Sequence, residues 1–181
     1  DRLNDALRGL EAALEAGFEK VKVNTVLIGG FNDDEIPSLA ALTLRYPIDM
    51  RFIELMPMGG GFEQRAYLPC GVVLERLPML EPVGQSGTAR LYRLPGALGN
   101  VGLISPVSAH FCAECNRLRL TADGKLKPCL HGGEEFSIKG LDRAGMEAQM
   151  RRAVLAKPEC HAPLSSARPS QSGRAMYRIG G

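Results

Sequence analysis

Three cysteines lie close together in the sequence and could hold a metal. Cys112 and Cys115 form a C-x2-C pair, and Cys129 follows a turn-like segment. This spacing occurs in zinc ribbons and in iron–sulfur sites, and structural zinc also needs a fourth protein ligand. The candidates for that ligand are His110, His131, Cys160 and His161. A cubane cluster on three thiolates would instead leave one iron open to a substrate, and the local spacing does not decide between the two metals.

A predicted β-hairpin after the cysteine pair brings basic side chains beside Cys129. Residues 122–124, Ala-Asp-Gly, fit a three-residue loop whose glycine takes the left-handed backbone conformation. This register pairs Thr121 with Lys125, Arg119 with Lys127 and Arg117 with Cys129. Since side chains alternate along strands, one face carries Arg117, Arg119, Lys125, Lys127 and Cys129, and the core face carries Leu118, Leu120 and Leu126. A two-residue loop would place Cys129 on the opposite face from both arginines.

Arg119 and Lys127 face each other across the hairpin in this register, and like charges directly opposite repel. An anion bound between them would remove that repulsion. The alternative is a solvated basic face on which the two side chains splay apart. Beside a candidate metal site we favour the anion, so the hairpin predicts a negatively charged substrate next to the cysteines.

The segments that precede the hairpin follow the order helix, strand, helix, strand. Leucines at helical spacing predict a helix over residues 3–14, and β-branched residues predict a strand over 21–27. Asp33 is the expected N-cap of a second helix that begins near Ile36 and ends before Pro47, and a strand over 49–55 follows. This order with short connections is typical of a parallel α/β sheet or barrel.

The pattern changes after the glycines at 59–61. From there we expect a short helix over 72–77, strands over 89–94, 101–104, 117–121 and 125–127, and a helix over 141–155. We therefore predict a domain boundary near residue 60. An α/β region over 1–60 would precede a smaller mixed region over 61–181.

Several segments resemble, in the right order, the C-terminal part of one enzyme family. They are residues 15–17, 21–24, 31–35, 51–56, 105–130 and 179–181. The family is the GTP 3′,8-cyclases, radical S-adenosylmethionine (SAM) lyases that begin molybdenum cofactor (molybdopterin) biosynthesis. The resemblance implies that 1–60 form the last βα units of an incomplete (β/α) radical SAM barrel. It implies a small mixed α+β auxiliary-cluster region over 61–181.

The resemblance also implies an activity and its cofactors. Enzymes of this family convert GTP to (8S)-3′,8-cyclo-7,8-dihydroguanosine 5′-triphosphate with two 4Fe-4S clusters. A cluster in the N-terminal part cleaves SAM to a 5′-deoxyadenosyl radical, which takes a hydrogen from the ribose. The second cluster is held by three cysteines, and its open iron contacts the guanine. The alternatives are a related radical SAM protein with another substrate, or a zinc-binding module.

Site residues follow from the same resemblance. Cys112, Cys115 and Cys129 would hold the second cluster. The expected GTP-binding residues are Lys22, Arg51, Arg117, Leu118 and Arg119. Met56 would contact SAM, and Gly180 and Gly181 would form an active-site tail. No residue is assigned a catalytic role.

Simpler interpretations exist for some of these residues. Lys22 alternates with valines and could direct its charge out of a sheet. Met56 could serve only in packing. Arg51 and Met56 are an odd number of residues apart, so a regular strand would point their side chains to opposite faces of the sheet. Both can reach one site only if the strand ends between them.

The chain lacks the C-x3-C-x2-C motif with which radical SAM enzymes hold the SAM-cleaving cluster, and it begins at Asp1 without a methionine. We expect a piece of a longer protein that is inactive without its N-terminal half and exposes a sheet edge. The expected partners are GTP and that N-terminal half, and a homodimer is left open.

Composition restricts the other classes of function. The 181 residues carry a net charge of +2 and no apolar run near the roughly 20 residues of a membrane span, so we expect no nucleic-acid and no membrane partner. Five cysteines, three of them clustered, favour a reducing, cytoplasmic location over a disulfide framework. Cys70 is interpreted as a packed or surface thiol, and Cys160 as a weaker metal candidate.

Overall fold

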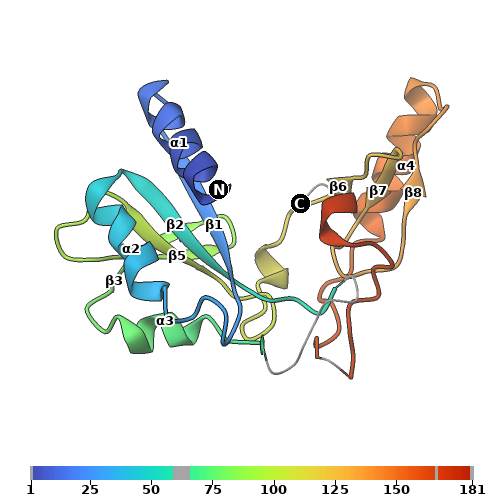
Figure 1. Cartoon of the computed structure of the whole chain (residues 1–181). Coiled ribbons are helices and arrows are strands. Elements are labelled where there is room, and N and C mark those ends of the chain that lie inside the picture. The colour runs from blue at the N-terminus through green and yellow to red at the C-terminus, as the bar shows by residue number, and fades with distance from the viewer. Residues whose placement is uncertain (1, 59–65, 166, 180–181) are drawn as a thin grey trace. The chain divides into compact units, whose positions relative to one another are not determined.

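The computed structural model describes residues 2–58, 66–165 and 167–179, which form two compact units (Figure 1). The first unit consists of Asp1–Glu54 and Leu68–Ser108, and the second of Leu55–Tyr67 and Ala109–Gly181. The boundary expected between residues 60 and 61 lies outside the described residues. The chain leaves the first unit near that position but returns to it at Leu68. Residues 68–108 therefore belong with the α/β part and not with the mixed region.

The first unit is built on one sheet. Its elements are α1 (Arg2–Glu15), β1 (Val21–Leu27), α2 (Ile36–Arg45), β2 (Ile48–Glu54), α3 (Gly71–Arg76), β3 (Glu81–Ser86), β4 (Ala89–Arg93) and β5 (Asn100–Ile104). The strand order is β1-β2-β5-β4-β3. β1, β2 and β5 are parallel, as the helix–strand order predicts, whereas β4 and β3 run antiparallel to their neighbours. The sheet is therefore mixed, and β3 is not predicted from the sequence because Pro82 and Gly84 interrupt its pattern.

The two faces of this sheet differ in character. Met50, Phe52 and Val101 are fully buried in a core with Ile36 of α2 and Val73 of α3. Burial of each such side chain contributes about 1.5–3 kcal/mol. The register of the parallel strands places a polar set on the opposite face, namely Lys22, Asn24, Asp49, Arg51 and Asn100.

Helix α2 begins at Ile36, as the sequence predicts, but its N-cap is not the predicted one. Its N-cap is Glu35, and Pro37 lies in its first turn. Asp33 instead accepts a hydrogen bond from the Gly30 amide at 2.7 Å and pairs with Arg76 of α3 at 2.6 Å. The expectation that Asp33 caps α2 is wrong, because this carboxylate is engaged by the turn and by α3.

The second unit contains a smaller sheet. Its elements are the 3-10 helices η2 (Cys112–Glu114) and η3 (Met176–Arg178), the strands β6 (Arg119–Leu120), β7 (Lys125–Lys127) and β8 (Phe136–Ser137), and the helix α4 (Arg143–Leu155). The antiparallel strands have the order β6-β7-β8, and α4 packs against β7 and β8. Asp142 caps α4 by accepting a hydrogen bond from the Gly145 amide at 2.8 Å. Among the helices of the described residues, none combines the length and apolarity needed to cross a membrane.

The hairpin of β6 and β7 forms in the predicted register. Arg119 pairs with Lys127, Leu120 pairs with Leu126, and Gly124 has a φ of 78° in the loop. Leu126 is buried, but Leu120 is 57% exposed. The expectation that Leu120 faces a core is wrong, because β6 is a two-residue edge strand and the packed helix lies over its neighbours.

Candidate functional site

The two ends of the hairpin present the three clustered cysteines. The 3-10 helix η2 sets Cys115 one turn after Cys112, with the Cys115 amide donating to the Cys112 carbonyl at 3.0 Å. Cys129 follows β7, the strand that pairs with β6. All three thiols are free and half-buried, so a metal can reach them.

Electrostatic interactions connect these cysteines with Arg119. Burial lowers the pKa of Arg119, and the charges of Cys115 and Cys129 partly restore it. Burial likewise raises the pKa of the Cys112 thiol, and nearby Cys160 and Cys115 add to this rise. The structure therefore places Arg119 near Cys115 and Cys129, and Cys160 near Cys112.

Lys157 holds the backbone segments that carry these cysteines. Its Nζ donates to the carbonyl oxygens of Arg117 at 2.9 Å and Pro128 at 3.0 Å, and it lies 3.6 Å from the Cys115 sulfur. Hydrogen bonds to carbonyls and a cation beside a thiolate both stabilise a sulfur-ligand site. Neither motif nor periodicity singles out Lys157, because its partners lie in segments far from it in the sequence.

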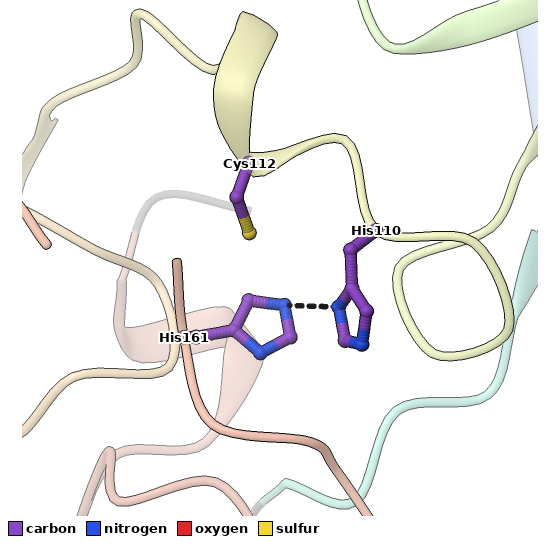
Figure 2. Close-up of side chains that lie close together, drawn as sticks. All are labelled: His110, Cys112 and His161. Atoms are coloured by element: carbon purple, nitrogen blue, oxygen red, sulfur yellow. Dashed lines mark hydrogen bonds between the residues drawn. The ribbon is translucent and has the colours of Figure 1, made fainter. Parts of the chain in front are cut away.

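Three histidines gather beside Cys112. His110 Nδ1 lies 3.3 Å from His161 Nε2, and the centroids of the His131 and His161 rings are 4.6 Å apart. Figure 2 shows the Cys112 sulfur pointing toward the His161 ring. Burial, followed by the charges of His161, Arg119 and His110, lowers the pKa of His131 to about 4. The candidates for a fourth ligand thus lie together, and His131 is neutral at pH 7.

A pocket lies along the segment that contains strand β6. Its volume is ≈ 570 Å³, and it is lined by Asn116, Arg117, Leu118, Arg119, Leu120 and Ile179. Arg119 donates a hydrogen bond to the Ile179 carbonyl at 3.5 Å. Three of the residues expected to bind GTP therefore share one pocket with the segment that leads to the C-terminus, while Gly180 and Gly181 lie outside the described residues.

Comparison with families of known proteins shows which family this chain belongs to. The model of the family described as Molybdenum Cofactor Synthesis C matches residues 48–163, which include the three cysteines and both pocket arginines. The chain belongs to the Molybdenum Cofactor Synthesis C family.

Curated relatives extend this similarity over nearly the whole chain. The GTP 3′,8-cyclase of Alkaliphilus metalliredigens is 45% identical over 186 residues, which cover 99% of this chain and 58% of that protein. The GTP 3′,8-cyclase of Moorella thermoacetica is 46% identical over 186 residues, which cover 96% of this chain and 57% of that protein. The chain thus spans about 58% of the length of such relatives.

In this member of the Molybdenum Cofactor Synthesis C family, Lys127 is buried and engaged by groups of the chain itself. Its side chain is 1% exposed, and its Nζ donates to the Gly132 carbonyl at 2.7 Å and lies 3.7 Å from Glu135. Burial lowers the pKa of Lys127, and Glu135 partly restores it. Glu135 thus already compensates the charge of Lys127 within the chain, so the repulsion from which the sequence predicts an anion beside Arg119 is relieved, and the anion stays a prediction.

Lys22 and Arg51 lie on the polar face of the first sheet. Lys22 is exposed on the edge strand β1, with Asp49 as its register partner. Arg51 is 8% exposed and donates to Asp49 and Ser86, each at 3.1 Å. Gly102 leaves room for it, since a Cβ there would lie 2.9 Å from Arg51 Cγ. The buried Arg51 Nε has no hydrogen-bond partner within the described part of the chain.

Met56 lies beyond the strand that carries Arg51. Strand β2 ends at Glu54, and Met56 is half-buried in the second unit. The strand therefore ends between Arg51 and Met56, as it must if both side chains are to reach one site.

Cys70 is a packed thiol of the first unit. It is 1% exposed, and its single S–H can donate to the carbonyl oxygen of Phe52, 3.4 Å from the sulfur, or to that of Ile104, 3.3 Å from it. Burial raises the pKa of Cys70 to about 12, so the thiol stays protonated at pH 7. The interpretation of Cys70 as a packed thiol is confirmed.

Glu54 is a fully buried acid that the sequence arguments did not single out. Its carboxylate accepts hydrogen bonds from the amides of Cys70 at 3.0 Å, Val107 at 2.8 Å and Ser108 at 2.9 Å, and from the Ser108 hydroxyl. It thereby joins the end of β2 to the start of α3 and to the segment after β5. One acid at the end of a strand is a weak signal, and only the fold brings its donors together.

An ion-pair network holds the hairpin loop to the C-terminal segment. Arg174 donates to Asp123 and to Glu135, each at 2.8 Å, and Lys125 lies 3.2 Å from Glu135. The hydrogen bond from Arg174 is the largest cause that lowers the pKa of Glu135 to about 2. The same guanidinium holds the pKa of Asp123 below its usual range.

Acid is expected to weaken the second unit through this network. Because the pKa of Glu135 is about 2 in the folded chain against an ordinary value of 4.5, its contribution is complete above about pH 4.5 and is lost as the pH falls toward 2. The difference between the urea midpoints of the unchanged chain and Arg174→Leu should therefore be larger at pH 7 than at pH 3. Arg151→Leu, which removes an exposed pair with Glu147, is the matched control. An equal difference at both pH values would contradict the prediction.

Proposed function

We propose that this chain is the C-terminal part of a GTP 3′,8-cyclase, the radical SAM enzyme of the first step in molybdenum cofactor biosynthesis. The full-length enzyme would convert GTP to (8S)-3′,8-cyclo-7,8-dihydroguanosine 5′-triphosphate in the cytoplasm. The observation that carries this proposal is the pocket of Arg117, Leu118 and Arg119, whose Arg119 interacts with the charges of Cys115 and Cys129.

The chemistry of the three thiols fits a 4Fe-4S cluster. Such clusters are held by cysteine thiolates, and Cys112, Cys115 and Cys129 are free and half-buried. Lys157 and Arg119 place positive charge near Cys115, which suits the negative charge of a cluster held by thiolates. When bound, the cluster supplies an iron with an open position for the guanine. The work of the surrounding residues is to bind and orient the nucleotide.

Arg117 and Arg119 are proposed to bind GTP, with Leu118 as the apolar wall between them. Burial and the neighbouring Arg117 disfavour the charge on Arg119. A bound anion would offset both effects. Charge-assisted hydrogen bonds from guanidinium groups are also directional, so the pair would fix the orientation of the nucleotide.

On the polar face of the first sheet, Lys22 and Arg51 are proposed to meet the GTP phosphates. The unsatisfied Arg51 Nε supports this, since buried donors normally have partners. Met56 is proposed to contact SAM, and Gly180 and Gly181 are proposed to complete the site as a tail.

An N-terminal half with the SAM-cleaving cluster is the proposed partner of the first unit. Apolar side chains near the edge strand β1 are exposed, with Phe18 at 67%, Val26 at 42% and Phe31 at 76%. The amphipathic helix α1 buries none of its residues in the described part of the chain. Exposed apolar surface of this kind supports a docking interface.

Anaerobic reconstitution of the chain with iron and sulfide tests the cluster assignment. We expect a brown protein with about four irons per chain. A colourless protein with one zinc and no iron would overturn the proposal.

The arginine pocket has its own test. Arg117→Ala or Arg119→Ala should weaken GTP binding by about 10- to 100-fold, because each removes charged hydrogen bonds worth about 1.5–3 kcal/mol. Iron content should stay nearly unchanged, since neither side chain is a proposed ligand. Calorimetric titration with GTP and an iron assay on the same sample measure both. Arg151→Ala, on the exposed face of α4, is the control. Loss of iron in both pocket variants would show that these arginines mainly support the fold.

A further inference from the structure

His110, Cys112 and His161 form a second set of metal ligands, which shares only Cys112 with the three cysteines (Figure 2). One ligand atom from each of the three lies within 4.8 Å of the others. The two facing nitrogens, His110 Nδ1 and His161 Nε2, are 3.3 Å apart. A tetrahedral zinc ion with Zn–N bonds of about 2.05 Å separates two nitrogen ligands by about 3.3 Å. The imidazoles are therefore already at the spacing of zinc ligands.

The hydrogen bonds of His161 leave the appropriate nitrogen available. His161 Nδ1 lies 2.8 Å from the carbonyl oxygen of Ala162. A carbonyl oxygen can only accept, so Nδ1 carries a proton, and Nε2, which faces His110, is the ring nitrogen left as a candidate ligand atom. Histidines that bind metals commonly donate their other ring N–H to a backbone carbonyl, which fixes the ring orientation. His161 has this arrangement.

We propose that His110, Cys112 and His161 bind a single zinc ion when the chain carries no iron–sulfur cluster. Nitrogen and thiolate ligands suit zinc, and three protein ligands leave one coordination position open. Zinc and cluster would exclude one another because both need Cys112, a consequence that rests on the proposed function. Zinc bound first would therefore delay iron uptake.

Titration of the metal-free chain with Co²⁺ under anaerobic conditions tests the zinc site. We expect one Co²⁺ per chain, with the visible absorption of a tetrahedral thiolate site, and displacement by Zn²⁺. His110→Ala, Cys112→Ala and His161→Ala should each weaken binding at least about 100-fold, since loss of an outer-shell partner alone costs about 10- to 100-fold. His110 is exposed, so its variant leaves the packing intact. Cys115→Ala and Cys129→Ala are the matched controls and should bind Co²⁺ as tightly as the unchanged chain.

The outcomes separate this site from the cluster. Full iron uptake but lost Co²⁺ binding in His110→Ala and His161→Ala would support a distinct zinc site. Lost Co²⁺ binding in Cys115→Ala and Cys129→Ala, with normal binding in both histidine variants, would assign the ion to the three cysteines and overturn the proposal. An unchanged chain that binds no Co²⁺ would also overturn it, even with four irons taken up. Intact Co²⁺ binding without iron uptake would support the zinc site and contradict the proposed function instead.

Discussion

Single replacement of Cys112, Cys115 or Cys129 by alanine is expected to remove most of the iron from the reconstituted chain. A cubane cluster on three thiolates has no protein ligand to spare, so the loss of one thiolate leaves two irons without protein sulfur. Iron and sulfide assays after anaerobic reconstitution, together with the visible spectrum, measure the result. The unchanged chain should hold about four irons under the same conditions.

Cys160→Ala is the matched control for these variants. Cys160 is an exposed thiol that interacts with Cys112, but it is not among the proposed ligands of the cluster. Its variant should keep its iron. If Cys160→Ala loses iron while Cys129→Ala keeps it, the third ligand is Cys160, and the assignment of Cys129 is wrong.

Glu54→Ala is expected to lower the free energy of unfolding by about 3 kcal/mol or more. The change leaves the amides of Cys70, Val107 and Ser108 without their acceptor in a buried place. Each unsatisfied buried donor costs about 1–3 kcal/mol. Urea denaturation followed by far-ultraviolet circular dichroism measures the loss.

Two further variants make the Glu54 prediction specific. Glu54→Gln keeps the shape and one acceptor oxygen, so its loss should lie between zero and that of alanine. Glu81→Ala removes an exposed acid from the edge strand β3 and should change the free energy by no more than about 0.5 kcal/mol. A loss below about 1 kcal/mol for Glu54→Ala would contradict the view that this carboxylate joins three segments of the first unit.

Local patterns were sufficient for much of the framework. The strand predicted over 21–27 is β1 (Val21–Leu27), because alternating β-branched residues encode strand conformation over short distances. The hairpin register followed from a three-residue loop with glycine at 124. The length of the loop and the positive φ angle of its glycine determine which residues pair. Local patterns also explain why the predictions for Asp33 and Leu120 were wrong. Asp33 is engaged by Arg76 of α3, and Leu120 lies on the edge strand of a small sheet, and neither fact is recorded in the neighbouring sequence.

The spacing of Cys112, Cys115 and Cys129 was enough to mark a candidate metal centre and the arginines proposed beside it, because those residues lie within one turn and one hairpin. The tertiary structure alone placed Lys157 on the backbone of that hairpin, His161 against His110, and the amides of three segments around Glu54. These partners are separated by 40, 51 and 53 residues for Lys157–Arg117, His161–His110 and Glu54–Val107. Contacts over such distances depend on how the chain folds back on itself, and neither residue type nor periodicity records that path.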